Sequence, residues 1–156
     1  MNTPLRRTIL WILNALGAFV GVWALFWPRG FYDVFPGLGF GAWAAEGPFN
    51  EHFVRDVGAL YLALVAAGVF AALARRADAA VAVGIAWLVF SVPHLAYHLG
   101  HLHGLAPIDA IAQPMALALT FVLAIPLVFP PRRTDRAADA ASTRPTAGTT
   151  EAASRR

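Results

Sequence analysis

The sequence contains no cysteine and no lysine, and few of its residues carry a charge. Without cysteine, the chain cannot form a disulfide and offers no thiolate for metal binding or redox chemistry. Only 13% of the 156 residues are charged, whereas soluble domains carry roughly 25%. Hydrophobic residues make up 58% of the chain. This composition predicts an integral membrane protein.

All twelve basic residues are arginines, and the formal net charge is +3. Basic chains often bind nucleic acid, but that function needs basic residues gathered on one surface or stripe. Here the arginines stand at the ends of apolar runs, which is typical of charges that orient membrane spans. We therefore expect the lipid bilayer as the main partner and expect no nucleic acid.

Four apolar runs are each long enough to cross a bilayer. A helix needs about 20 residues to cross a hydrocarbon core of roughly 30 Å, and backbone groups in lipid must be satisfied internally, which favours helices. Gly100 and Pro107 divide the longest run into a helix, a short loop and the start of the next helix. The sequence predicts an all-α fold, an integral membrane four-helix antiparallel bundle within residues 1–131. The predicted spans are about 8–28, 53–74, 79–100 and 107–130.

The arginines also predict the orientation. Arg6 and Arg7 before an apolar stretch resemble the start of a signal peptide, but the stretch runs to about 20 residues and ends in Trp23 and Trp27, which favours a retained span. Arginines are more frequent before the first span, between the second and third, and after the fourth than in the other loops. This pattern predicts a multi-pass protein of the cell membrane with both termini in the cytoplasm. Residues 132–156 lack large apolar side chains and are predicted to form a disordered cytoplasmic tail.

Histidines gather at the outward end of the third span. Four of the five lie between Ser91 and His103. Residues at i, i+4, i+7 and i+11 share one face of a helix, and Trp87, Ser91, His94 and His98 fit this spacing. His94 therefore lies about one turn, roughly 6 Å, deeper than His98.

Polar side chains at i, i+4 spacing mark the same end of the second and fourth spans. The pairs are Glu51 with Arg55 and His52 with Asp56 in the second span, and Asp109 with Gln113 in the fourth. Ionisable groups at membrane depth are costly, about 2.5–3.5 kcal/mol each, so we expect them to point inward and to be paired. Three helices then bring polar side chains to one outward-facing pocket.

The histidines and carboxylates of this pocket favour a metal or haem site in a membrane redox protein. His94 and His98 have the spacing that lets two imidazoles of one helix bind one ion, and a set of histidine and carboxylate ligands suits zinc, iron or copper. For haem, His94 and His52 are candidate axial ligands from facing helices. The predicted metal ligands are His94, His98, Asp56, Glu51 and His52, with Arg55, Ser91, Asp109 and Gln113 as pocket support.

Two other interpretations stay open. In the first, the polar residues are structural: Asp56 or Glu51 pairs with Arg55, or Asp56 accepts a hydrogen bond from a histidine. That arrangement needs no ligand ion and suits a non-enzymatic ligand-binding or accessory membrane subunit. In the second, histidine beside aspartate marks a proton path, as in a proton-relaying transporter component.

Two features outside the pocket bear on packing. Gly17 and Gly21 form a G-x-x-x-G pair in the first span, with Asn14 and Ala24 on the same face. Small residues let helix backbones approach closely, so this face serves either inside one bundle or in a homodimer; other membrane subunits are further candidate partners.

The aromatic loop 28–49 is predicted to lie on the membrane surface, either as a plain connection or as a partial lid.

The stretch Arg55-Asp-Val-Gly-Ala-Leu-Tyr-Leu-Ala-Leu-Val-Ala-Ala-Gly68 resembles the opening of the second helix in small bacterial four-helix membrane proteins of the DoxX-like type. Those proteins often share an arginine, a nearby glycine and an aliphatic run. The resemblance covers about residues 8–130 and implies a compact antiparallel bundle. The family name comes from a subunit linked to quinone-coupled sulfur oxidation. The histidine-rich end of the third span and the Asn50-Glu-His element depart from the family pattern, so no catalytic residue is carried over.

Overall fold

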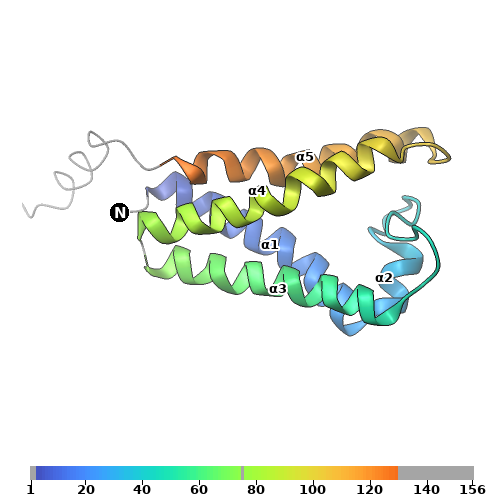
Figure 1. Cartoon of the computed structure of the whole chain (residues 1–156), viewed down its shortest axis with the longest axis horizontal. Helices are drawn as coiled ribbons and strands as arrows, with labels where there is room; N and C mark the ends of the chain where they lie inside the picture. Colours follow the sequence, from blue (N-terminus) through green and yellow to red (C-terminus); the bar gives the residue numbers. More distant parts are fainter. Residues whose placement is uncertain (1–2, 75, 130–156) are drawn as a thin grey trace, which may run out of the picture.

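The computed structural model of the chain describes residues 3–74 and 76–129. Within these ranges the chain forms five α-helices and no strand, which confirms the predicted all-α fold (Figure 1). The helices are α1 (Pro4–Phe26), α2 (Pro28–Val34), α3 (Glu51–Ala74), α4 (Ala77–Gly100) and α5 (Pro107–Val128). The predicted disordered tail, residues 132–156, lies outside the described residues.

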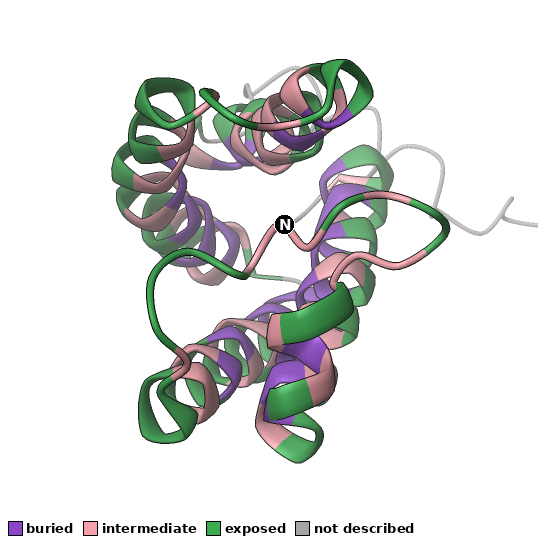
Figure 2. Cartoon of the chain, turned by 90° about the vertical axis from the view of Figure 1, so that its right-hand side faces the viewer, coloured by how far each residue is buried: buried purple, intermediate pink, exposed green. Residues whose placement is uncertain are grey.

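The helices α1, α3, α4 and α5 are long and apolar enough to cross a membrane, containing 23, 24, 24 and 22 residues. Even the shortest is about 33 Å long at 1.5 Å per residue, against roughly 30 Å of hydrocarbon. Figure 2 shows that exposed residues lie on the outer faces of the helices and buried ones on the inner faces. Many exposed side chains are large and apolar, for example Trp11, Phe19, Leu60, Phe70 and Val89. Such extensive apolar exposure is unusual in water and indicates a lipid bilayer environment.

Prolines define where three helices begin. Pro4, Pro28 and Pro107 each stand at the start of a helix, where a missing backbone N–H is tolerated. Pro28 also disfavours helical backbone at the preceding residue, so α1 ends at Phe26 and the short α2 follows. The first span therefore ends two residues earlier than the predicted 8–28.

The four long helices pack mainly as two pairs, α1 with α3 and α4 with α5, and the contact between α3 and α4 is less extensive. Figure 1 shows the pairs close together at the end where the chain begins and further apart at the opposite end. We call the first the terminal end. We call the second the loop end, because the loop of residues 35–50, which joins α2 to α3, lies there.

Glycines bring α1 and α3 into close contact. A Cβ atom at Gly58 would lie 2.5 Å from a backbone nitrogen of α1, and one at Gly68 would lie 2.1 Å from Oδ1 of Asn14. Cβ atoms at Gly17 and Gly21 would each come within 2.9 Å of an α3 side chain. The predicted G-x-x-x-G face therefore packs within the chain, where small residues let the backbones approach.

Apolar side chains fill the terminal half of the helices. The fully buried residues here come from all four long helices: Leu10, Leu13, Ala71, Ala72, Ala80, Ala124 and Leu127. A Cβ atom at Gly84 would lie 2.6 Å from Cβ of Leu127, so α4 and α5 also touch closely. In the described part of this half, the buried polar side chains are Arg6, at the very end, and Asn14, near the middle of α1.

Arg6 joins α1 to α5 and α4 at the terminal end. Its Nη1 donates to the carbonyl oxygens of Pro126, at 2.9 Å, and of Phe129. Its Nη2 donates to the carbonyl oxygens of Leu127, at 2.7 Å, and of Ala77, at 3.4 Å. The last carbonyls of a helix lack partners within the helix and form the negative end of its dipole. A buried arginine therefore neutralises the end of α5.

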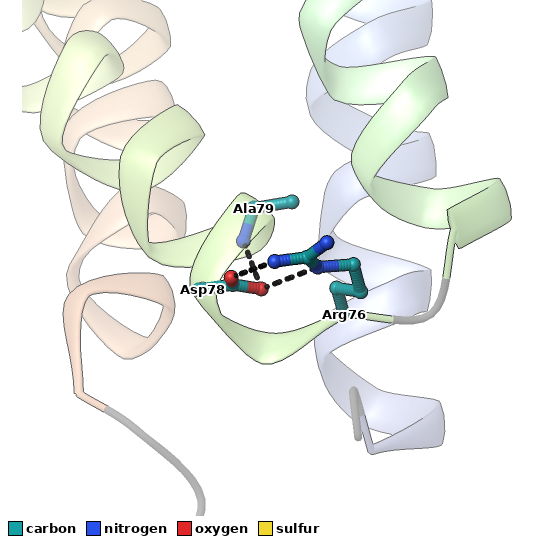
Figure 3. A network of polar contacts seen from close by, with 3 residues as sticks. All are labelled: Arg76, Asp78 and Ala79. Atoms are coloured by element: carbon teal, nitrogen blue, oxygen red, sulfur yellow. Dashed lines mark hydrogen bonds and ion pairs between the residues drawn. The ribbon is translucent and has the colours of Figure 1, made fainter.

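An exposed ion pair marks the start of α4 (Figure 3). Arg76 Nη2 lies 2.5 Å from Asp78 Oδ2, and Asp78 Oδ1 accepts from the Ala79 backbone N–H at 3.0 Å. A carboxylate is favourable in the first turn of a helix. Its hydrogen bond to the guanidinium raises the pKa of Arg76 above its usual value. The connection between α3 and α4 thus presents charge to solvent at the terminal end.

Candidate functional site

The polar pairs at the start of α3 lie on an exposed face. His52 Nε2 is 3.3 Å from Asp56 Oδ2, and Arg55 Nε is 2.9 Å from Glu51 Oε1, which confirms both predicted i, i+4 pairs. The side chains of His52 and Asp56 are 87% and 56% exposed. These two residues are therefore at the surface and do not line an interior pocket.

Arg55 acts on the end of α1 and not on the histidines of α4. In addition to Glu51, its Nη1 donates to the carbonyl oxygen of Leu25 in the last turn of α1. Carbonyls in that position have no helical partner, and a cation is favourable beside them. Arg55, predicted as pocket support, instead holds the start of α3 against the end of α1.

The structure does not support the predicted metal or haem site. Within residues 3–74 and 76–129, no three His, Cys, Asp or Glu side chains are placed to hold a metal ion. His94 and His98 are neighbours, but their rings meet edge to face, with centroids 4.8 Å apart. His94 also stacks on Phe90 at 4.9 Å. The structure therefore does not gather the predicted set His94, His98, Asp56, Glu51 and His52, and the exposed His52 does not face His94 as a second axial ligand.

Asp109, in the first turn of α5, holds the loop. Its carboxylate accepts from the backbone N–H of Gly41 at 3.1 and 3.2 Å and from the indole N–H of Trp43 at 2.7 Å. One turn along α5, Gln113 Nε2 donates to the carbonyl oxygen of Trp43 at 3.4 Å. Both side chains are almost completely buried. The predicted i, i+4 pair thus anchors residues 35–50 to α5.

Glu46 is a site residue that the sequence analysis missed. Its Oε1 lies 3.5 Å from Nδ1 of His98, whose side chain is only 12% exposed. Its carboxylate also lies beside Tyr97, while Gln113 lies beside the His98 ring. The i, i+4 spacing identifies residues on one face of a helix and therefore could not identify Glu46, which lies in a loop. The one available signal was charge, because Glu46 is one of only two acidic residues in segment 28–49.

Five polar residues thus meet where α4, α5 and the loop converge. We call them the loop-end cluster: Glu46, Tyr97, His98, Asp109 and Gln113. Most of their hydrogen bonds hold the loop in place. Two buried atoms, Nδ1 of His98 and Oε1 of Gln113, have no full hydrogen bond. The cluster therefore combines a structural role with unused hydrogen-bonding capacity.

A second set of polar atoms lies deeper, on α1 and α4. Trp87 Nε1, Ser91 Oγ and both amide atoms of Asn14 are buried and have no hydrogen-bond partner. Ser91, predicted as pocket support, follows Trp87 by one turn on the same face of α4. We call Asn14, Trp87 and Ser91 the interior row. Most buried polar side-chain atoms in proteins have a partner, so these groups have hydrogen-bonding capacity that no described residue uses.

Comparison of the chain with models of protein families, with curated proteins and with solved structures found no match. The resemblance to DoxX-like proteins therefore stays a prediction. The function has to be inferred from the chemistry of the loop-end cluster and the interior row.

Proposed function

We propose that the chain is a cell-membrane protein that binds a small ligand without catalysing a reaction, with the loop of residues 35–50 as its cover. One observation carries this proposal: both the loop-end cluster and the interior row contain buried polar side chains with hydrogen-bonding atoms that no described residue fully satisfies. They are Asn14, Trp87, Ser91, His98 and Gln113. Leaving a buried polar group unpaired costs about 1–3 kcal/mol, so a ligand that pairs with these groups gains affinity.

The proposal includes an orientation. Arginines in the first turn of α1, between α3 and α4 and after α5 favour a cytoplasmic terminal end, so the loop end faces outward and both termini are cytoplasmic. The small separations in sequence between the end of α3 at Ala74 and the start of α4 at Ala77, and between α4 and α5, suit a four-helix antiparallel bundle. The DoxX-like resemblance implies the same arrangement. Partner subunits or a second copy of the chain would then contact the lipid-facing sides.

The distribution of polar groups favours binding over transport. A proton relay needs polar or ionisable groups along the whole path through a membrane. Here no buried polar side chain lies between Asn14 and Arg6 in the described part of the terminal half, which is filled by residues such as Leu10, Leu13 and Leu127. A ligand-binding or accessory subunit is therefore the better interpretation than a proton-relaying transporter component.

Native mass spectrometry of protein purified in mild detergent from its own membrane tests the proposal. We expect wild type to carry a bound small molecule that Gln113→Leu retains much less. Thr120→Val, on the same helix, is the matched control, because the Thr120 hydroxyl already donates to the Leu117 carbonyl at 2.8 Å. A wild-type protein with no bound molecule, or equal retention in both variants, would refute ligand binding at this site.

The same preparation tests the redox interpretation. Elemental analysis and a visible spectrum are expected to show neither a stoichiometric metal nor a haem band, because the histidine and carboxylate side chains are not gathered for one. About one zinc, iron or copper per chain, or a haem spectrum, would contradict this expectation. The function would then be that of a metal- or haem-binding membrane redox protein.

A further inference from the structure

The interior row offers both kinds of hydrogen-bonding group. The indole N–H of Trp87 can only donate, the hydroxyl of Ser91 can donate or accept, and the amide of Asn14 can do both at once. All three side chains are more than nine-tenths buried, and none of these atoms has a partner within residues 3–74 and 76–129. A molecule that satisfies the row must therefore present a hydrogen-bond acceptor to Trp87.

Close helix contacts bring the row together. Asn14 and Gly17 lie three residues apart on the buried face of α1, about 4.5 Å along the axis. A Cβ atom at Gly17 would lie 3.3 Å from the ring of Trp87, and one at Gly68 would lie 2.1 Å from Asn14. Ser91 follows Trp87 by about 6 Å along α4. Asn14 therefore packs against α3 and the ring of Trp87 packs against α1, with Ser91 one turn further along α4.

The surroundings of the row carry no charge. Among the described residues, the buried charged side chains are Arg6 and Asp109. Arg6 binds carbonyl oxygens at the terminal end, and Asp109 binds the loop at the other end. Trp87 lies ten residues into α4, about 15 Å from its start. A charged ligand at this depth would lose its hydration without gaining a counter-charge, which is strongly unfavourable.

The neighbours of Trp87 are apolar or aromatic. The ring of Tyr61 lies 6.1 Å from that of Trp87 and that of Phe90 lies 6.4 Å away, both edge to face. Val83 and Leu88 pack in the same core. Beyond its polar group, a ligand in this position therefore meets hydrocarbon surface.

We propose that the interior row binds an uncharged, mostly apolar ligand whose carbonyl oxygen accepts the hydrogen bond of the Trp87 indole N–H. The hydroxyl of Ser91 is a second donor to the same oxygen, and the Asn14 amide binds a neighbouring polar atom. This inference rests on the proposed ligand-binding function and names the chemical class of the ligand.

Nuclear magnetic resonance of the indole N–H groups tests the proposal directly. The chain has five tryptophans, and Trp87→Phe identifies the Trp87 signal. The probe is cyclohexanone, with cyclohexane, cyclohexylammonium and cyclohexanecarboxylate as controls of matched size. We expect cyclohexanone alone to move the Trp87 indole proton signal downfield in a saturable way. The signal of Trp11, on the lipid-facing side of α1, reports any general effect of probe dissolved in the detergent.

A second pair of variants separates recognition from folding. Ser91→Ala removes one hydroxyl and is expected to weaken cyclohexanone binding by about fivefold, the effect of one neutral hydrogen bond. Thr120→Ala removes a hydroxyl that bonds within its own helix and is expected to leave binding unchanged. Equal weakening by both variants would contradict recognition by the row.

Three results would overturn the proposal: no response of Trp87 to cyclohexanone, an equal response to cyclohexane, or a stronger response to either charged probe. A cross-peak between the Trp87 indole proton and water that cyclohexanone leaves unchanged would also overturn it, because ordered water would then fill the row. A charged molecule found by native mass spectrometry would refute the neutral-ligand inference but leave the ligand-binding function intact. Absence of both a bound molecule and a cyclohexanone response would refute both.

Discussion

At the scale of single residues, two arginines stabilise the molecule by binding backbone carbonyls of other helices. Arg6 reaches the end of α5, and Arg55 reaches the end of α1. Each helix end has carbonyls that its own helix cannot satisfy, and lipid offers no donors. The cation therefore contributes a hydrogen-bond donor and a charge that complements the helix dipole.

Arg6→Gln is expected to lower the stability of the protein in detergent by about 1.5–3 kcal/mol, the range for hydrogen bonds to a charged group. Thermal unfolding followed by circular dichroism measures the change. Arg7→Gln is the matched control, because it removes the same charge from the neighbouring residue, whose Nε has no hydrogen-bond partner among the described residues. Equal melting temperatures for the two variants would show that Arg6 acts only through its charge.

At the scale of helices, the contact between α1 and α3 depends on glycine. Gly58→Ala would place a Cβ atom 2.5 Å from an α1 backbone nitrogen, whereas Gly100→Ala would meet open space. We expect Gly58→Ala to destabilise the protein by about 1–3 kcal/mol through overpacking. Gly100→Ala is expected to be neutral or slightly stabilising, since alanine favours helix more than glycine does. Unfolding of both variants in the same detergent gives the comparison, and equal stabilities would contradict the close contact.

We expect the hydrogen bonds to Asp109 to hold the loop of residues 35–50 in place. Asp109→Leu removes the acceptor for Gly41 and Trp43, so backbone amides in residues 37–45 should exchange with deuterium faster. Asp109→Asn keeps one oxygen acceptor and should give a smaller increase. Asp33→Leu, which breaks an exposed pair with Arg29, is the control and should leave this segment unchanged. An unaltered exchange rate in Asp109→Leu would show that the loop is held by its aromatic contacts alone.

The sequence predicted the helices and the local pairs but not which polar residues meet. Apolar length located all four long helices, and i, i+4 spacing found the pairs of Asp56 with His52 and of Arg55 with Glu51. Spacing also placed both the α3 pairs and His98 at the same end of the molecule. Spacing along a helix does not tell how that helix is rotated about its own axis relative to its neighbours. The exposed position of Asp56 was therefore not predictable. The partner of His98, Glu46, comes from a loop without periodicity.

At the scale of the whole molecule, the proposed orientation can be tested cleanly because the chain has no cysteine. Leu38, in the loop, is 95% exposed between two glycines with positive φ. Leu38→Cys is expected to react with a membrane-impermeant maleimide added to intact cells. Asp78→Cys, exposed at the terminal end, should react only after the cells are opened. The reverse pattern would place the termini outside and refute the orientation.

The contacts of Arg6 have a mechanical consequence. At the terminal end the Arg6 side chain joins α1 to both α4 and α5, and α4 begins three residues after the end of α3. At the loop end, the polar contacts between the two helix pairs that are seen among the described residues run through the loop, to Asp109, Gln113 and His98. We therefore expect any relative motion of the α1–α3 pair and the α4–α5 pair to be smallest near Arg6 and largest beside Glu46.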